Sequence, residues 1–214
     1  MRLFTLGVTL VLTLCSAALM AEEKPVGITP DRMHVEADHQ GQTIIIHRNP
    51  DHTATIDPDF ALTSRPCPPF CIQPMHIAPG VETIGELEVL DMLERINAGD
   101  DSIILIDSRT PDWVARGMIP GAINVPWTML NVSRSDPLTI ADLLETQFGA
   151  MQTDGFWDFS QAKTLVLYCN GLWCGQSPTN IKTLLRLGYP AHKLKWYRGG
   201  MQAWQTVGLT TTTP

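Results

Sequence analysis

Apolar and polar residues follow two periods along this chain, one typical of strands and one of helices. Short aliphatic and β-branched runs predict buried strands at residues 102–106, 123–125, 164–168 and 195–197. Apolar residues spaced three or four apart predict amphipathic helices, at residues 81–98, 111–116, 140–148, 178–187 and 201–207. This alternation indicates an α/β fold with a parallel sheet flanked by helices on both faces.

The segment 164–188 places a cysteine between a strand and a helix. Cys169 follows the predicted strand directly. Ser177 offers an N-cap, and Pro178 suits the first helical position. Free N–H groups and the helix dipole stabilise negative charge at a helix N-terminus. The segment therefore predicts a reactive thiolate with room for an anionic substrate beside it.

The N-terminal residues have a different pattern. Arg2, an apolar run at 3–14 and small residues up to Ala21 are typical of a cleaved secretory signal at residues 1–21. An uncleaved membrane anchor is the alternative, although the run is short for a bilayer. Cleavage would place the mature protein in the periplasm, and no later run is long enough to span a membrane.

Residues 22–80 are predicted to form a small N-terminal extension of strands and loops. The runs 33–36 and 43–48 flank turn residues at 38–41 and predict a hairpin. Prolines exclude a helix from the Cys-Pro-rich stretch 64–74. In the helix that follows, Thr83 and Glu86 fit a capping box. The main domain is predicted at 81–209, with a disordered tail at 210–214.

Composition excludes several classes of partner and cofactor. The 214 residues carry a formal net charge of −7, and removal of a signal would take Arg2 away. An acidic protein does not match nucleic acid or an anionic membrane surface. The sequence contains no phosphate-binding loop, dinucleotide fingerprint or paired-carboxylate motif, so no cofactor is predicted.

Cys67 and Cys71 lie in the proline-rich stretch of the extension. In an oxidising compartment a local disulfide is the favoured interpretation. A metal site is the sharper alternative, because five of the six histidines share the segment (His34, His39, His47, His52, His76). Those histidines lack tight ligand spacing, so no metal is predicted. A third interpretation is a thiol relay that exchanges with the Cys169 loop.

The order of parts resembles the rhodanese-like sulfurtransferase family over residues 81–209. Four pieces carry the resemblance: the helix and strand ahead of Asp107; Asp107-Ser108-Arg109 followed by Gly-Met-Ile-Pro-Gly-Ala at 117–122; the strand 165–169 that delivers a cysteine; and Arg198-Gly199-Gly200 with Trp204. Met118 stands where the family usually has histidine.

The resemblance implies a rhodanese-like sheet and a sulfurtransferase. Cys169 would take sulfane sulfur from a small anionic donor such as thiosulfate, and its persulfide would pass the sulfur to a thiol or cyanide. Asp107 and Arg109 would form a structural motif. The predicted substrate-binding residues, which supply loop N–H groups, a helix start and one cation, are Asn170, Gly171, Leu172, Trp173, Gly175, Gln176, Ser177 and Arg198.

The loop from Cys169 to Ser177 departs from the family pattern. It is longer, has no Arg or Lys, and contains Cys174, a second candidate catalytic residue. Cys174 is predicted to resolve a modified Cys169 by forming a disulfide, which would require a periplasmic redox protein as reductant. The alternatives are a second sulfur carrier or a cysteine paired elsewhere.

Two alternative functions remain open at this point. One is a dithiol oxidoreductase that uses Cys169 and Cys174, and the other is a catalytically silent binding module. Of the six tryptophans, most are predicted to lie in the core, whereas Trp173 lies in the loop and is predicted to wall a pocket.

Overall fold

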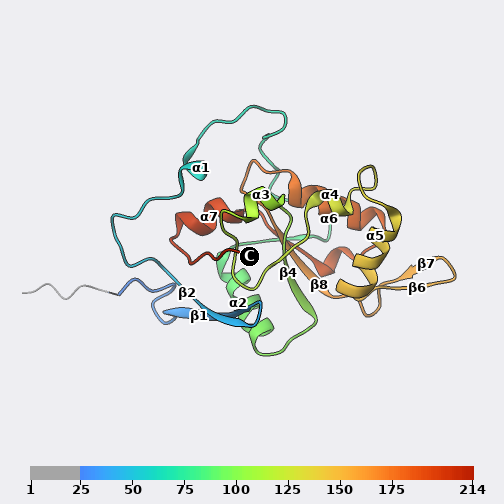
Figure 1. The fold of residues 1–214 in the computed structure, drawn as a ribbon, viewed down its shortest axis with the longest axis horizontal. Helices are drawn as coiled ribbons and strands as arrows, with labels where there is room; N and C mark the ends of the chain where they lie inside the picture. The colour runs from blue at the N-terminus through green and yellow to red at the C-terminus, as the bar shows by residue number, and fades with distance from the viewer. Residues whose placement is uncertain (1–24) are drawn as a thin grey trace, which may run out of the picture.

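The computed structural model describes residues 25–214, so the predicted signal at 1–21 lies outside the described residues. One five-stranded sheet, in which every strand pair is parallel, forms the centre of the molecule (Figure 1). Its order is β3 (Glu82–Ile84), β9 (Leu194–Tyr197), β8 (Thr164–Tyr168), β4 (Ile103–Asp107) and β5 (Ile123–Asn124). The predicted α/β class with a parallel sheet is confirmed.

Helices cover both faces of this sheet. One face packs against α2 (Glu86–Asn97) and α7 (Gly200–Thr206). The opposite face packs against α4 (Trp127–Leu130), α5 (Pro137–Asp142), the π-helical turn η1 (Leu143–Gln147) and α6 (Gln176–Arg186). The short elements α3 (Pro111–Val114) and η2 (Ala191–Lys193, a 3-10 turn) complete the connections.

Strand β8 lies at the centre and is buried on both faces. Val166 and Tyr168 pack in the cluster with α2 and α7, whereas Leu165 and Leu167 pack in the cluster with α6. Successive side chains of a strand point to opposite faces, so a central strand must be apolar at every position. This is why the sequence predicts β8 at its observed bounds, 164–168.

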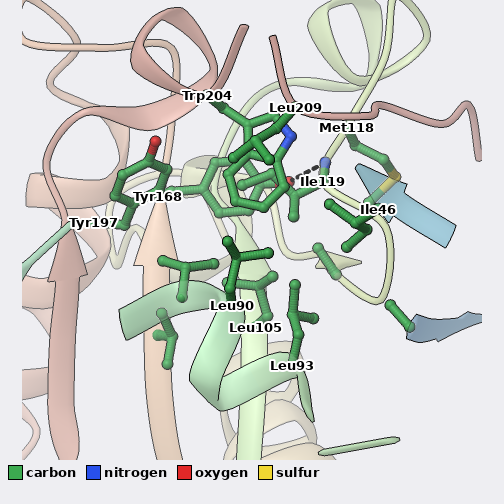
Figure 2. Packing of buried hydrophobic residues seen from close by; sticks show 14 of the residues in the cluster. Ile46, Leu90, Leu93, Leu105, Met118, Ile119, Tyr168, Tyr197, Trp204 and Leu209 are labelled. Atoms are coloured by element: carbon green, nitrogen blue, oxygen red, sulfur yellow. Dashed lines mark hydrogen bonds between the residues drawn. The ribbon is translucent and has the colours of Figure 1, made fainter. Parts of the chain in front are cut away.

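Figure 2 shows the first cluster, in which Tyr168, Tyr197 and Trp204 pack among aliphatic side chains. Trp204 is fully buried, as predicted for the closing helix, and its indole N–H donates to the Thr210 carbonyl at 2.9 Å. The backbone N–H of Ile119 donates to the hydroxyl of Tyr168 at 3.1 Å (Figure 2). Each buried polar atom of these aromatic side chains therefore has a partner within the described chain.

The N-terminal extension packs against the same hydrophobic core. Its hairpin consists of β1 (His34–His39) and β2 (Gln42–His47), which confirms the predicted turn. Gln40 and Gly41 adopt positive φ angles of 55° and 80°, as tight hairpin turns require. Val35, Ala37, Ile46 and, from α1 (Pro58–Ala61), Phe60 are buried in the cluster of α2 and α7. Residues 25–80 therefore share the main core.

The prediction of one helix over 81–98 is wrong at its start. Residues 82–84 form strand β3, which pairs with β9 at the sheet edge. Gly85 is the N-cap of α2, and its N–H donates to the Glu88 carboxylate at 2.9 Å. The expected capping box at Thr83 and Glu86 is therefore shifted by two residues, because the edge of the sheet takes the preceding backbone.

Two other boundaries differ from the prediction. The helix expected at 140–148 begins at Pro137, because the Asp136 carboxylate accepts the N–H of Leu138 at 2.8 Å. The hairpin of β6 (Met151–Thr153) and β7 (Phe156–Asp158) was not predicted. Its short strands are mostly exposed and lack an apolar pattern.

The expected disordered tail at 210–214 is instead attached to the domain. Thr210 N–H donates to the His47 carbonyl at 3.1 Å, and Met118 N–H donates to the Thr212 carbonyl at 2.7 Å. These bonds satisfy backbone groups that would otherwise face water. Over residues 25–214, no helix combines the length and the apolar character needed to cross a bilayer.

Candidate active site

The candidate site lies at the carboxyl ends of the central strands. Cys169 follows β8, and Asp107 ends the neighbouring strand β4. Ligands in open parallel sheets bind at this edge. The backbone of Cys169 is held by the N–H of Met201, which donates to the Cys169 carbonyl at 3.0 Å. The strand and the start of α7 thus fix the cysteine together.

The environment of Cys169 favours its thiolate. Burial raises the pKa of the Cys169 thiol, but hydrogen bonds from the Cys174 thiol, the Ser177 hydroxyl, and the backbone N–H groups of Ser177 and Asn170 outweigh it and lower the pKa below its ordinary value. The Ser177 hydroxyl lies 3.1 Å from Sγ. The loop N–H groups therefore act as the sequence predicts, on the cysteine itself.

Ser177 does not cap the helix as predicted. Gly175 is the N-cap of α6, so Ser177 and Pro178 are the second and third helical residues. The Ser177 hydroxyl accepts the indole N–H of Trp196 at 3.1 Å and donates to Cys169 Sγ. Because the hydroxyl is held by these two bonds, it does not bond to the free N–H groups at the start of α6.

Replacement of Ser177 by alanine should raise the pKa of Cys169, because it removes one hydrogen bond to the charged form. A thiol becomes anionic as the pH rises, so the thiolate should form at higher pH in Ser177→Ala than in the wild type. Thiolate ultraviolet absorbance, titrated against pH, measures this shift. The same titration of Cys169→Ser is subtracted to isolate the signal, and an unchanged midpoint would contradict the role given to Ser177.

Cys174 is the second free cysteine, and it is kept as a thiol. Burial, together with hydrogen bonding and repulsion from the Cys169 thiolate, raises the pKa of the Cys174 thiol well above its ordinary value. The carbonyl of Cys174 lies 3.4 Å from Cys169 Sγ, so the loop folds back over the first cysteine. The structure thus brings the two predicted catalytic residues together.

A cavity of about 380 Å³ opens beside Cys174. Cys174 lines it, whereas Cys169 is buried and is not among the lining residues. The remaining lining residues come from the extension, from the segments after β4 and β5, and from the loop and first turn of α6: Pro69, Phe70, Trp113, Trp127, Asn170, Trp173, Gly175, Gln176 and Thr179. A larger hollow, about 920 Å³ between 47–56 and 205–211, contains no cysteine.

Four of the predicted binding residues line the cavity: Asn170, Trp173, Gly175 and Gln176. Gly171 instead lies against Gln202, where a Cβ atom would approach the side-chain oxygen to 2.8 Å. Gly171 and Leu172, which were predicted to bind substrate, are therefore not among the residues that line the cavity. Leu172 is largely exposed, and its carbonyl accepts the N–H of Gln73 at 2.8 Å.

Arg198 does not reach the cavity, contrary to the prediction. Its guanidinium donates to the carbonyl oxygens of Gln73 at 2.8 Å and Pro74 at 3.0 Å. These bonds, with the bond from Gln73 to Leu172, fix the extension against the active-site loop. Arg198 is therefore a residue that positions the extension.

Asp107 and Arg109 form a buried ion pair. The guanidinium donates to the Asp107 carboxylate from Nε, at 2.9 Å and 3.1 Å to its two oxygens, and from Nη2 at 2.6 Å. Nη2 also donates to the Gly117 carbonyl at 2.6 Å, and Asn124 donates to both backbone carbonyls of the pair. The pair is at most 1% exposed and joins the turn at 117–122 to β4, so its predicted structural role agrees with its position.

Cys67 and Cys71 are joined by a disulfide. The loop that it closes presents Pro69 and Phe70, rather than its sulfur atoms, to the cavity. Phe70 packs edge-on against Trp173, with ring centroids 5.5 Å apart. No group of three or more metal-ligating side chains occurs within residues 25–214.

Sequence reasoning missed Pro69, Phe70, Trp113, Trp127 and Thr179 as cavity residues. The six tryptophans of the sequence could have indicated an aromatic cavity, but only Trp173 was predicted to line one. The others reach the cavity from segments far apart in the chain, and such adjacency leaves no local pattern. The predicted role of Trp173 as a pocket wall agrees with its position.

The chain is similar to a protein family and to several solved structures. The Rhodanese-like domain family model matches residues 88–206. A Bacillus halodurans protein is 19% identical, with 62% of this chain and 77% of that chain covered and a TM-score of 0.43. The rhodanese-like domain of an Anabaena protein is 17% identical (64% and 81% covered, TM-score 0.39). A human single domain sulfurtransferase is 20% identical (59% and 96% covered, TM-score 0.39). No curated protein matches the chain.

Proposed function

This chain belongs to the rhodanese-like domain family, and on that premise we propose that it is a sulfurtransferase with Cys169 as its nucleophile. The observation that carries the proposal is the environment of Cys169: a buried sulfur at the end of β8, with a lowered pKa and with donors from the loop and α6 around it. Those donors can also stabilise a terminal persulfide, which is likewise an anion.

The transfer is a double displacement. The Cys169 thiolate attacks the outer sulfur of a donor such as thiosulfate; a bond forms between the two sulfurs, and sulfite leaves with the electron pair of the broken bond. A thiolate or cyanide acceptor then attacks the outer sulfur of the persulfide, and the Cys169 thiolate is regenerated. Neither step requires an external oxidant or reductant.

Mass spectrometry of the protein after incubation with thiosulfate tests this proposal. The expected product carries the mass of one additional sulfur, mapped to the peptide that contains Cys169. Addition of cyanide should remove that mass and release thiocyanate in equal amount. A protein that gains no sulfur from thiosulfate or from an organic donor would overturn the proposal and leave the dithiol oxidoreductase and the silent binding module.

The proximity of Cys174 favours a second candidate, a dithiol oxidoreductase. The Cys174 carbonyl lies 3.4 Å from Cys169 Sγ, and hydrogen bonding between the two side chains lowers the pKa of Cys169 and raises the pKa of Cys174. Formation of a disulfide between them would release two electrons to an oxidant, and a periplasmic redox protein would restore the thiols. Peptide mapping of the same samples without reductant distinguishes a disulfide between Cys169 and Cys174 from a persulfide on Cys169.

The periplasm remains the proposed location. It rests on the predicted signal at 1–21 and agrees with the disulfide between Cys67 and Cys71, since such bonds persist in oxidising compartments. The proposed partners are the sulfur donor, its thiol or cyanide acceptor, and the redox protein.

A further inference from the structure

The cavity beside Cys174 has aromatic walls. Phe70, Trp113, Trp127 and Trp173 line it, and they come from the extension, from α3, from α4 and from the active-site loop. Trp173 is the common neighbour: its ring centroid lies 5.5 Å from that of Phe70 and 6.5 Å from that of Trp113. A volume of about 380 Å³ falls within the range of cavities that enclose small organic molecules. Thiosulfate would leave most of this apolar surface uncovered.

The side chains that line the cavity are uncharged, because the raised pKa of Cys174 keeps its thiol neutral. No Asp, Glu, Lys, Arg or His is among the residues that line it in the described part of the chain. The Asn170 side chain is 2% exposed, and its Oδ1 has no hydrogen-bond partner within residues 25–214. Buried amides are normally paired. The Asn170 amide is thus available to a polar group of a ligand, and rotation of the amide can present either its oxygen or its NH₂.

Arginine side chains lie over all four of these rings, since the guanidinium carbon of Arg65 is also 5.8 Å from the ring centroid of Phe70. The guanidinium carbon lies 3.8 Å from the ring centroid of Trp173 for Arg65, 4.8 Å from Trp113 for Arg116, and 5.0 Å from Trp127 for Arg134. None of the three arginines lines the cavity. The guanidinium groups already make cation–π contacts with these rings and place positive charge next to them. The walls therefore disfavour a cationic ligand and favour an apolar ligand that carries an anionic sulfur group.

We infer that the cavity selects an organic sulfur donor, an apolar or aromatic body that carries a thiosulfonate-type group, over inorganic thiosulfate. This inference rests on the proposed sulfur transfer at Cys169. The aromatic rings bury the body of the donor, and the Asn170 amide donates to its sulfonyl oxygens. The Cys169 thiolate forms a bond to the terminal sulfur of R–SO₂–S⁻, the bond between the two donor sulfurs breaks, and the sulfinate R–SO₂⁻ leaves with the electron pair.

Two donors that differ only in their bodies provide the kinetic test. Benzenethiosulfonate and methanethiosulfonate both release a sulfinate, and thiosulfate serves as the inorganic reference. Burial of the ring should give benzenethiosulfonate a KM roughly 10- to 100-fold below that of methanethiosulfonate. Phe70→Ala should remove much of this preference, and Trp173→Leu should do the same from another wall. The matched control is Phe156→Ala, an exposed phenylalanine on β7, which should leave both KM values unchanged.

A binding measurement separates this inference from the proposed function. Benzenesulfinate, the unreactive leaving group, is titrated calorimetrically into the Cys169→Ser protein, in which the cavity lining is intact. Tight binding of benzenesulfinate and weak binding of methanesulfinate support the aromatic selection even if no donor transfers sulfur. Equal KM values for the two thiosulfonates, with sulfur still reaching Cys169, would overturn the selection and leave the sulfurtransferase standing.

Discussion

Replacement of Cys169 by serine should lower the rate of sulfur transfer by roughly 10³-fold or more. Serine is nearly the same size, so the packing at the end of β8 should persist. Its hydroxyl stays neutral at physiological pH and cannot hold a transferable sulfur. Steady-state release of thiocyanate from cyanide, with thiosulfate or benzenethiosulfonate as donor, measures the loss. A rate within a few-fold of the wild type would remove Cys169 as the nucleophile.

Cys174→Ser is the matched control for that experiment. It makes the same change of atom five residues away, in a buried thiol that lines the cavity. If Cys174 only resolves a modified Cys169, this variant should still form the persulfide, and the persulfide should last longer. If Cys174→Ser abolishes uptake as completely as Cys169→Ser does, the two thiols act as a unit.

Replacement of Arg109 by methionine should lower the free energy of unfolding by about 3–5 kcal/mol, because it leaves the buried Asp107 carboxylate without its partner. The Gly117 carbonyl loses its donor as well. Methionine fills most of the space, so the effect comes from the unpaired charge and not from a cavity. Urea unfolding followed by tryptophan fluorescence measures the loss as a lower midpoint at constant slope.

Arg95→Met is the corresponding surface control. Arg95 pairs with Asp100 at 2.7 Å, but the Arg95 side chain is 56% exposed, so water and salt weaken the pair. Its loss should change stability far less than the loss of Arg109. Comparable losses from both variants would contradict the importance given to burial.

The sequence predicts the frame of the site because the frame depends on local patterns. Strand β8 appears in the sequence as a run of apolar residues because both of its faces are buried. The position of Cys169 could be predicted because it is the first residue after this strand. Asp107 and Arg109 were predicted as a structural motif from their spacing, and the structure shows that they form an ion pair. These features depend on neighbours within a few residues, and such neighbours leave a signal in the order of residue types.

Features that depend on distant segments were predicted poorly. Residues 82–84 have helical spacing with α2, but they join β9, which lies more than a hundred residues away. Arg198 was expected to bind substrate because it belongs to the closing motif of the family. Its hydrogen-bond partners are instead the carbonyl oxygens of Pro74 and Gln73, which lie 124 and 125 residues earlier in the chain. Phe70 likewise reaches the cavity from the extension. A propensity or a periodicity carries no information about such pairs.

The junction between the two ends of the described chain has a consequence for folding. Strand β2 has its outer partner in the last residues: His47 N–H donates to Thr210 Oγ1, 163 residues away, and Asn49 N–H donates to the Gly208 carbonyl. Strands β1 and β2 can pair with each other early, but these outer bonds can form only after residues 208–210 have been made. Contacts so distant in sequence slow folding and prolong the exposure of apolar side chains. The outer edge of β2 is thus among the last parts of the described chain to gain its partners.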